Sequence, residues 1–261
     1  MLGSLWSAAS GMKAQQVNID VTSNNLANVN TPGFKKARAE FQDLMYRTAS
    51  EAGAPVNNGT RTPIGSQIGM GVRAVGVARS FAQGDFLQTE NPYDMTIEGE
   101  GFFQVQMGDG TVAYTRDGGF KVDSNGTLVT SEGFIVQPNI SVPQGARQVT
   151  VTPEGVVTAM IGEQAQNLGQ IQLVRFVNPA GLTAQGRNLF KPTEASGDPQ
   201  TFAPGEAGAG TRVMQGALEN SNVKVVEEMV NLIVAQRAYE ANSKSISTAD
   251  EMLGQANNLK R

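Results

Sequence analysis

The chain has 261 residues, a formal net charge of −4, and neither histidine nor cysteine. The acidic balance argues against a nucleic-acid binder held by phosphate contacts. The missing imidazoles and thiols exclude histidine-based triads, HExxH zinc sites, disulfides, zinc–thiolate sites and iron–sulfur clusters. No run of about 18 apolar residues occurs, so we expect no membrane insertion. The N-terminus has no basic residue before its short apolar stretch, so we expect no cleaved signal peptide.

Residues 1–30 predict a helix. A narrow apolar stripe recurs every seven residues and consists of Leu5, Met12, Ile19 and Leu26. The predicted helix ends at Thr31-Pro32-Gly33, because Pro32 disfavours helical backbone at Thr31 and Gly33 permits positive φ. Near this end lies a group of amides, Asn24, Asn25, Asn28 and Asn30. Short amides of this kind cap a helix end or hydrogen-bond a neighbouring subunit.

Residues 31–81 are expected to form an extended connecting segment. The stretch from Tyr46 to Ser80 is rich in Gly, Ser, Thr, Asn and Pro. Its first half predicts an extended loop, since it has no apolar periodicity. Its last ten residues, Gly71–Ser80, alternate weakly and are compatible with a strand.

Residues 82–217 predict a central β domain. Glycine turns such as Ser124-Asn125-Gly126, which is a strong hairpin signal, separate short apolar or alternating runs. These runs are Phe102–Met107, Val112–Arg116, Phe120–Val122, Leu128–Thr130, Phe134–Val136, Gln148–Thr152, Val156–Ile161 and Gly169–Phe176. No helical pattern separates them, which favours a small antiparallel sandwich or barrel. Residues 193–211 predict a loop.

Residues 218–261 predict a second long helix, running from Ser221 to Leu259. Its heptad seam consists of Leu218, Val225, Leu232, Tyr239, Ile246 and Leu253. Small residues such as Ala235 and Ala249 follow three positions later and permit close helix approach. The predicted fold class is therefore α+β, with long terminal coiled-coil helices flanking a central, mainly antiparallel β domain. The two seams pair within one chain or meet other subunits, and we favour the second interpretation because each helix has only a narrow apolar stripe.

The sequence contains only weak signals for catalytic chemistry. No Gly-Lys dipeptide occurs, which excludes a Walker A loop, and no Gly-x-Ser occurs, which excludes a nucleophile elbow. The β region contains carboxylates that can in principle act as a glycoside-hydrolysing pair: Asp94, Glu98, Glu100, Asp109 and Asp117. Carboxylates in turns more often cap backbone groups or face solvent. We therefore expect no catalytic residue, no metal and no cofactor.

Three ordered sets of segments resemble the signatures of the rod and hook proteins of the bacterial flagellum. They are Ser23–Asn28 with Thr31–Lys35; then Asn91–Asp94, Gly99–Phe103 and Tyr114–Phe120; and finally Ser221–Val223, Glu227–Met229 and Gln236–Asn242. Hook proteins are typically longer. The chain length, together with Asn178–Leu182, Asn188–Phe190 and Thr193–Gly197, favours a distal rod subunit over a proximal rod component or a hook protein.

This resemblance implies a structural subunit rather than an enzyme. The subunit would form a rigid homopolymeric tube that transmits motor torque, with the terminal helices as inner coiled coils and the β domain outside. The implied partners are the proximal rod, the hook, the P- and L-ring bushing and the flagellar type III export apparatus, with no nucleic acid. The implied location is the basal body, from periplasm to outer membrane. The alternative is a peptidoglycan-cleaving enzyme that uses the β-domain carboxylates.

The seam residues and two of the amides thereby become candidate subunit-interface residues. They are Leu5, Met12, Ile19, Leu26, Asn24, Asn28, Leu218, Val225, Leu232, Tyr239, Ile246 and Leu253.

Overall fold

A computed structural model describes residues 2–258, apart from residues 54, 58, 59, 62, 147, 163 and 206–209. The chain folds into two compact units. The first, hereafter the helical unit, comprises Met1–Ala27, Ala37–Ala78 and Lys224–Arg261. The second, hereafter the β unit, comprises Asn28–Lys36 and Arg79–Val223. The expected connecting segment 31–81 is divided between the two units.

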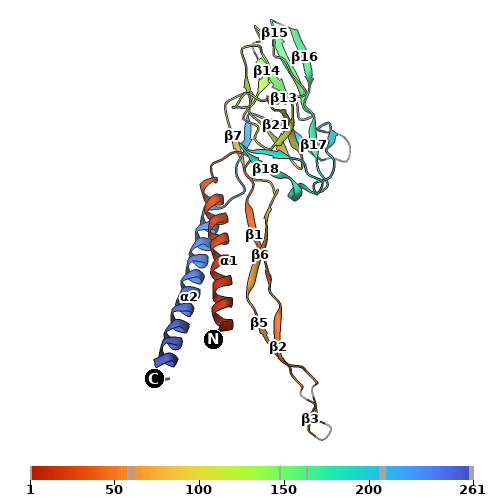
Figure 1. Cartoon of the computed structure of the whole chain (residues 1–261). Helices are drawn as coiled ribbons and strands as arrows, with labels where there is room; N and C mark the ends of the chain where they lie inside the picture. The colour runs from red at the N-terminus through yellow and green to blue at the C-terminus, as the bar shows by residue number, and fades with distance from the viewer. Residues whose placement is uncertain are drawn as a thin grey trace. The chain divides into compact units, whose positions relative to one another are not determined.

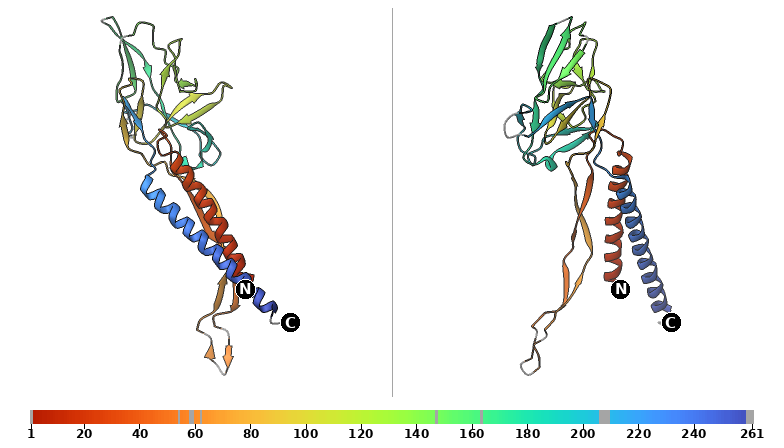
Figure 2. Two further views of the ribbon diagram at one scale, coloured as in Figure 1. Left: turned by 90° about the vertical axis from the view of Figure 1, so that its left-hand side faces the viewer. Right: turned by 180° about the vertical axis from the view of Figure 1, so that it is seen from behind.

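The helical unit contains α1 (Leu2–Ala27) and α2 (Val225–Asn258), which lie side by side in every view (Figures 1 and 2). Helix α1 ends before the predicted Thr31-Pro32-Gly33 stop, and turns cover residues 28–33, with Gly33 at a φ of 69°. Helix α2 begins at Val225 and not at Ser221, while the predicted end at Leu259 lies outside the described residues. Neither helix, over its described length, is both long and apolar enough to cross a bilayer.

A long two-stranded antiparallel ribbon completes the helical unit (Figure 1). Its paired strands are β1 (Ala37–Asp43) with β6 (Val72–Arg79), β2 (Tyr46–Ser50) with β5 (Ser66–Gly69), and β3 (Pro55–Asn57) with β4 (Thr60–Arg61). The strand expected over residues 71–80 is confirmed. The loop expected over the preceding residues is wrong, because β2, β3, β4 and β5 pair there with one another. Two-stranded ribbons are marginally stable alone, so this one depends on neighbours.

The β unit is built on a nine-stranded sheet whose strand pairs are all antiparallel. Strand β9 (Phe102–Gln106) pairs with three others, β10 (Val112–Thr115), β13 (Ile135–Gln137) and β17 (Leu173–Arg175). The remaining members are β11 (Lys121–Val122), β12 (Leu128–Val129), β18 (Thr183–Gly186), β19 (Leu189–Lys191) and β20 (Gln200–Phe202). The prediction of a mainly antiparallel β domain is confirmed.

The β unit also contains smaller antiparallel sheets. A meander consists of β14 (Gln148–Val151), β15 (Val156–Ile161) and β16 (Gln164–Gln170). Two further pairs are β8 (Met95–Glu98) with β21 (Arg212–Gln215), and β7 (Phe86–Gln88) with β22 (Ala217–Glu219). A 3-10 turn, η1, spans Pro179–Gly181. Strand β22 contains Leu218, which was expected on the terminal helix.

The alternation of side chains along β9 connects two apolar clusters. Phe103 and Val105 point into the larger cluster, whereas Phe102 joins a smaller aromatic one. Phe102 lies edge-on to Phe176, with ring centroids 5.8 Å apart. The two clusters form the core of the β unit, and they contain side chains from runs that the sequence predicts as apolar strands.

Most predicted strands of the β unit are confirmed, but two expectations are wrong. The predicted run Gly169–Phe176 divides between the end of β16 and the whole of β17. The Ile171 amide still donates to the Gly155 carbonyl beside β15, at 2.8 Å, whereas Leu173 pairs with Phe103 of β9 in the larger sheet. The loop expected over residues 193–211 contains β20, which pairs with β17; residues 206–209 lie outside the described part.

Candidate functional site

Helices α1 and α2 pack against each other in antiparallel orientation. A Cβ at Gly11 would lie 2.9 Å from the Asn242 amide nitrogen, and Asn25 Nδ2 lies 3.2 Å from Glu228 Oε2. The two contacts are 14 residues apart on either helix, which fixes the register. Buried alanines, Ala8, Ala235 and Ala249, permit this close approach. The small-residue face of α2 is therefore covered by α1 of the same chain.

The structure places the candidate interface residues in two environments. Those that are half-buried are Leu5, Met12, Ile19, Leu26, Asn28, Leu232, Ile246, Leu253 and Leu218, the last of these in β22. Those that are exposed are Asn24, Val225 and Tyr239. Helical geometry puts Leu232 and Ile246 on the same face as Ala235 and Ala249, toward α1.

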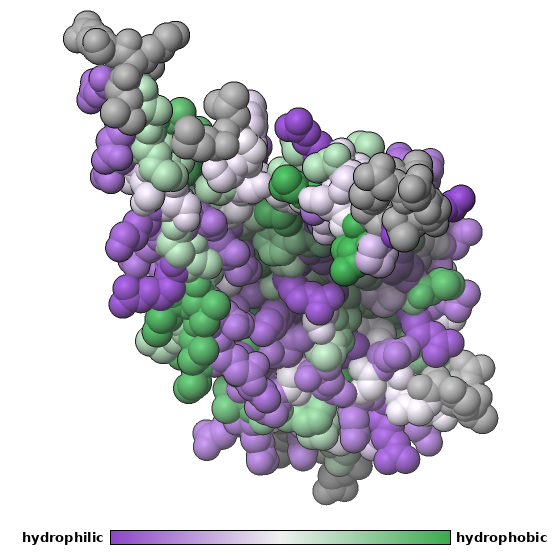
Figure 3. Space-filling view, turned by 90° about the horizontal axis from the view of Figure 1, so that it is seen from below, coloured by the Kyte–Doolittle hydropathy of each residue, from purple (hydrophilic) through white to green (hydrophobic). Residues whose placement is uncertain are grey.

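A second apolar face of α2 is exposed. It consists of Val226, Met229, Val230, Ile233 and Val234, with exposed fractions between 52% and 74%, and is called the α2 stripe below. At about 100° per residue, this stripe lies on the opposite side of the helix from Glu228 and Ala235, which are buried. The space-filling view likewise shows apolar side chains at the surface among polar ones (Figure 3). Grouped exposed apolar side chains mark interaction surfaces.

Asn25 joins three elements of the helical unit. Its side-chain amide donates to the Ala37 carbonyl at 2.8 Å and to Glu228 Oε2 at 3.2 Å, while its Oδ1 accepts from the Ala37 amide at 2.9 Å. The side chain is 1% exposed. Of the amides near the end of α1, Asn25 therefore holds α1, β1 and α2 together, and its role lies within the chain.

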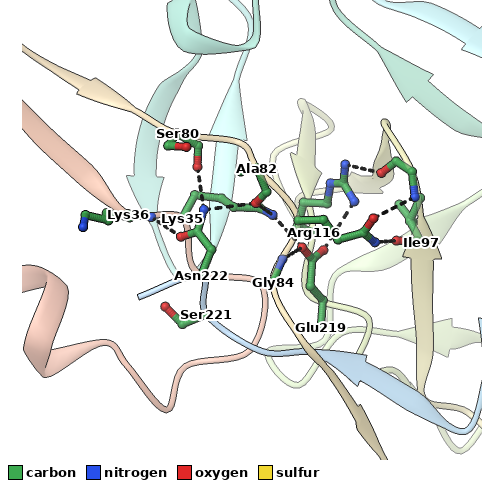
Figure 4. Close-up of polar contacts among 12 residues, drawn as sticks. Lys35, Lys36, Ser80, Ala82, Gly84, Ile97, Arg116, Glu219, Ser221 and Asn222 are labelled. Atoms are coloured by element: carbon green, nitrogen blue, oxygen red, sulfur yellow. Dashed lines mark hydrogen bonds and ion pairs between the residues drawn. The ribbon is translucent and has the colours of Figure 1, made fainter. Parts of the chain in front are cut away.

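A buried charge cluster lies inside the β unit (Figure 4). Glu219 Oε1 accepts hydrogen bonds from Lys35 Nζ at 2.6 Å and from the Gly84 amide at 2.9 Å, and Glu219 Oε2 accepts one from Arg116 Nη1 at 3.3 Å. Lys35 also donates to the Ala82 carbonyl at 2.8 Å, and Arg116 donates to the Gly99 carbonyl at 2.8 Å. The side chains of Lys35 and Glu219 are fully buried and that of Arg116 is 3% exposed.

Burial dominates the electrostatics of this cluster. It lowers the pKa of Lys35 below its usual 10.5, against the opposing effect of the Glu219 carboxylate. The pKa of Arg116 is lowered for the same reason. One carboxylate therefore compensates two buried cations, and backbone carbonyls satisfy further donors. Such a cluster is sensitive to the loss of any member, since that loss leaves an uncompensated buried charge.

Asn222 fastens the segments that enter the β unit. Its Oδ1 accepts from the Lys36 amide at 2.7 Å, and its amide nitrogen donates to the carbonyls of Ser80 and Ala82, each at 3.0 Å (Figure 4). Because these contacts hold the Asn222 side chain, it does not cap α2, which explains the late start of that helix. Segments 35–36, 80–82 and 219–222 thus meet, and they include residues from the first and the last of the three motif sets.

The candidate carboxylates of the β domain shape turns. Asp94 accepts hydrogen bonds from Thr89 Oγ1 at 2.7 Å and from Asn91 Nδ2 at 2.8 Å. Asp117 accepts one from the Gly119 amide at 3.0 Å. Asp109 accepts hydrogen bonds from the Thr111 hydroxyl at 2.6 Å and from the Thr111 amide at 2.9 Å, and these two bonds lower the pKa of Asp109. Asp109 and Asp117 form Asx turns, in which the carboxylate accepts from the amide two residues later. Asp94 instead accepts from side chains of the preceding loop, so all three carboxylates serve local structure.

Comparisons with known proteins agree with this arrangement. Residues 5–35 match the family "Flagella basal body rod protein", residues 96–159 match "Flagellar hook protein FlgE/F/G D1 domain", and residues 214–259 match "Flagellar basal body rod FlgEFG protein C-terminal". The chain is 53% identical to the flagellar basal-body rod protein FlgG of Borreliella burgdorferi, over the whole of both chains. It is 48% identical to FlgG of Buchnera aphidicola, over 99% of this chain and 100% of that one. It is 40% identical to FlgG of Bacillus subtilis, again over both whole chains.

The paired terminal helices, the antiparallel β unit and the three matched segments define an axial protein of the flagellar rod and hook class. Within this class, the chain is at least 40% identical to the three FlgG proteins over 99% or more of its length. The chain belongs to the FlgG family of flagellar basal-body rod proteins, and it is a structural subunit of the distal rod.

Proposed function

We propose that this subunit polymerises with copies of itself into a rigid axial tube that transmits motor torque toward the hook and filament. The observation that carries the proposal is the α2 stripe, which leaves five apolar side chains on one helix face exposed. Fully burying such a side chain contributes about 1.5–3 kcal/mol, so covering the stripe drives association. The terminal helices would form inner coiled coils, in which the α1–α2 pair of one chain contacts the pairs of its neighbours.

The hydrogen bonds of Asn222 support a role in carrying load. The chain passes between its two units four times, and three of these passages adjoin residues that these hydrogen bonds join: Lys36, Ser80 and Asn222. Hydrogen bonds that tie these segments together resist their separation under torque. The β unit would then form the outer layer of the tube and receive force through several strands of chain at once.

The partners, the location and the export route are proposed from membership of the family. The tube would join the proximal rod below and the hook above, pass through the P- and L-ring bushing, and span from periplasm to outer membrane. Its subunits would reach the growing tip through the flagellar type III export apparatus. We also propose that the chain is not an enzyme, since Asp94, Asp109 and Asp117 of its β unit are engaged in local hydrogen bonds. Cleavage of purified peptidoglycan by the wild-type chain would contradict this part.

Assembly of purified protein tests the central proposal. Ile233→Glu places a charge in the α2 stripe, and Gln255→Glu places the same charge at an exposed polar position of the same helix. We expect sedimentation and electron microscopy to show polymers for the wild type and Gln255→Glu, and a folded monomer for Ile233→Glu. Normal polymers of Ile233→Glu would show that the stripe is not an assembly surface.

A further inference from the structure

A second exposed apolar surface lies in the helical unit, between the first turns of α1 and the ribbon. It is a groove of about 500 Å³, walled by Trp6 and Ser7 on α1 and by Arg47, Ile68 and Met70 on the ribbon. Trp6, the single tryptophan of the chain, is 69% exposed there. We call this surface the Trp6 groove.

The walls of the Trp6 groove are fixed by direct contacts. Ser10 Oγ accepts a hydrogen bond from the Val72 amide at 3.2 Å and donates one to the Ser7 carbonyl at 2.8 Å. Gly71, at a φ of 111°, allows the ribbon to approach α1 so closely that a Cβ would collide with Ser10. Arg47 and Ile68 are cross-strand partners in β2 and β5, so they share one face of the ribbon. The groove is therefore preformed.

The α2 stripe has complementary chemistry but cannot reach the groove of its own chain. In the antiparallel register, Val230 lies alongside residue 23 of α1, because Asn25 faces Glu228 and Gly11 faces Asn242. The groove lies at Trp6, about 17 residues further along α1. At 1.5 Å per residue this separation is about 26 Å. A stripe that occupies the groove must therefore come from another copy.

We propose that the Trp6 groove of one copy receives the α2 stripe of a second copy. This inference rests on the proposed self-assembly and specifies the contact. Apolar walls meet apolar side chains, and Arg47 on the groove meets Glu227 beside the stripe, whose side chain is 55% exposed. The two surfaces are different and lie at opposite ends of α1, so the contact is heterologous and each copy retains one free groove and one free stripe. Such a contact continues into an open polymer, whereas stripe-to-stripe pairing would close as a dimer.

Complementation between two variants of the full chain tests this contact. Met70→Glu blocks the groove and leaves the stripe intact, while Ile233→Glu blocks the stripe and leaves the groove intact. We expect each variant alone to be a monomer with wild-type circular dichroism, and a 1:1 mixture to form a heterodimer that stops there, measured by analytical ultracentrifugation. The matched controls Met70→Leu and Ile233→Leu should polymerise.

The outcomes separate this inference from the proposed function. Dimers of Met70→Glu alone would indicate stripe-to-stripe pairing and overturn the inference, as would a mixture that stays monomeric while the wild type polymerises. A wild-type chain that stays monomeric would contradict the self-assembly itself, and this contact with it.

The fluorescence of Trp6, the single tryptophan of the chain, shows which of the two grooves in the mixture is filled. With Trp6→Phe added to the Met70→Glu chain, the only tryptophan of the mixture lies in the filled groove. Its emission should move to shorter wavelength on mixing, because the stripe excludes water from the indole. With Trp6→Phe added instead to the Ile233→Glu chain, the remaining tryptophan lies in the blocked groove, and its emission should not move. Equal responses in the two arrangements would overturn the proposed contact.

Discussion

Replacement of Glu219 by glutamine tests the charge cluster of the β unit. Glutamine keeps the size of the side chain but removes the negative charge that faces Lys35 and Arg116. Both cations are buried, so neither gains compensation from water. Removing one partner of a buried ion pair costs about 3–5 kcal/mol, a large part of the roughly 5–15 kcal/mol that stabilises a typical domain. We therefore expect Glu219→Gln to lower the free energy of unfolding of the β unit by about 3–5 kcal/mol.

Hydrogen exchange of the full-length chain, followed by mass spectrometry, measures this loss for each unit separately. Protection of β9 and β10 should fall in Glu219→Gln, and urea unfolding should give the corresponding free energy. The matched control is Glu240→Gln, which removes an exposed ion pair with Arg237 (N–O distance 3.0 Å) and should cost less than about 1 kcal/mol. A loss below about 1 kcal/mol for Glu219→Gln would refute the stabilising role of the cluster.

Three further predictions concern the cluster, the helix pair and the ribbon. Burial lowers the pKa of Lys35, so between that lowered pKa and 10.5 the unfolded chain binds more protons than the folded one. The free energy of unfolding, measured by urea titration, should therefore rise with pH across this window. The variant Lys35→Met should lack that rise. Leu232→Asp puts a charge on the half-buried face toward α1, and should abolish polymers and helix protection in hydrogen exchange while the β unit stays folded; normal polymers would contradict this. Deleting residues 53–63, the part of the ribbon beyond the β2–β5 pair, leaves the residues of the Trp6 groove in place and should give polymers that form but curve in electron micrographs. A ribbon that bridges neighbouring copies would resist the sliding between them that bending requires. Straight, stiff polymers would assign the segment a dispensable role.

Periodicity in the sequence was sufficient for the helices and most strands. The seven-residue repeats predict α1 and α2, and glycine turns such as Ser124-Asn125-Gly126 predict the hairpins of the β unit. Strands β2 and β5 of the ribbon were not predicted, because they pair with each other without burying an apolar face. Every residue of these two strands is exposed, so their sequence shows no alternation of apolar and polar side chains.

The candidate surfaces were harder to predict. The α2 stripe is present in the sequence as a second apolar face in residues 226–234, but a count at seven-residue spacing selects only the face toward α1. The partners Lys35 and Glu219 are 184 residues apart, and no local pattern indicates that they meet. Asn222 looks like a helix cap because its residue type fits that position, whereas its contacts in the β unit decide its role.

The structure of the polymer that the purified wild-type chain forms, determined by electron cryomicroscopy, tests whether the α2 stripe is the assembly surface. We expect a hollow tube of identical copies in which Val226, Met229, Val230, Ile233 and Val234 are buried against neighbouring copies. A polymer in which these side chains remain exposed to solvent, or a chain that forms no polymer under any assembly condition, would contradict it.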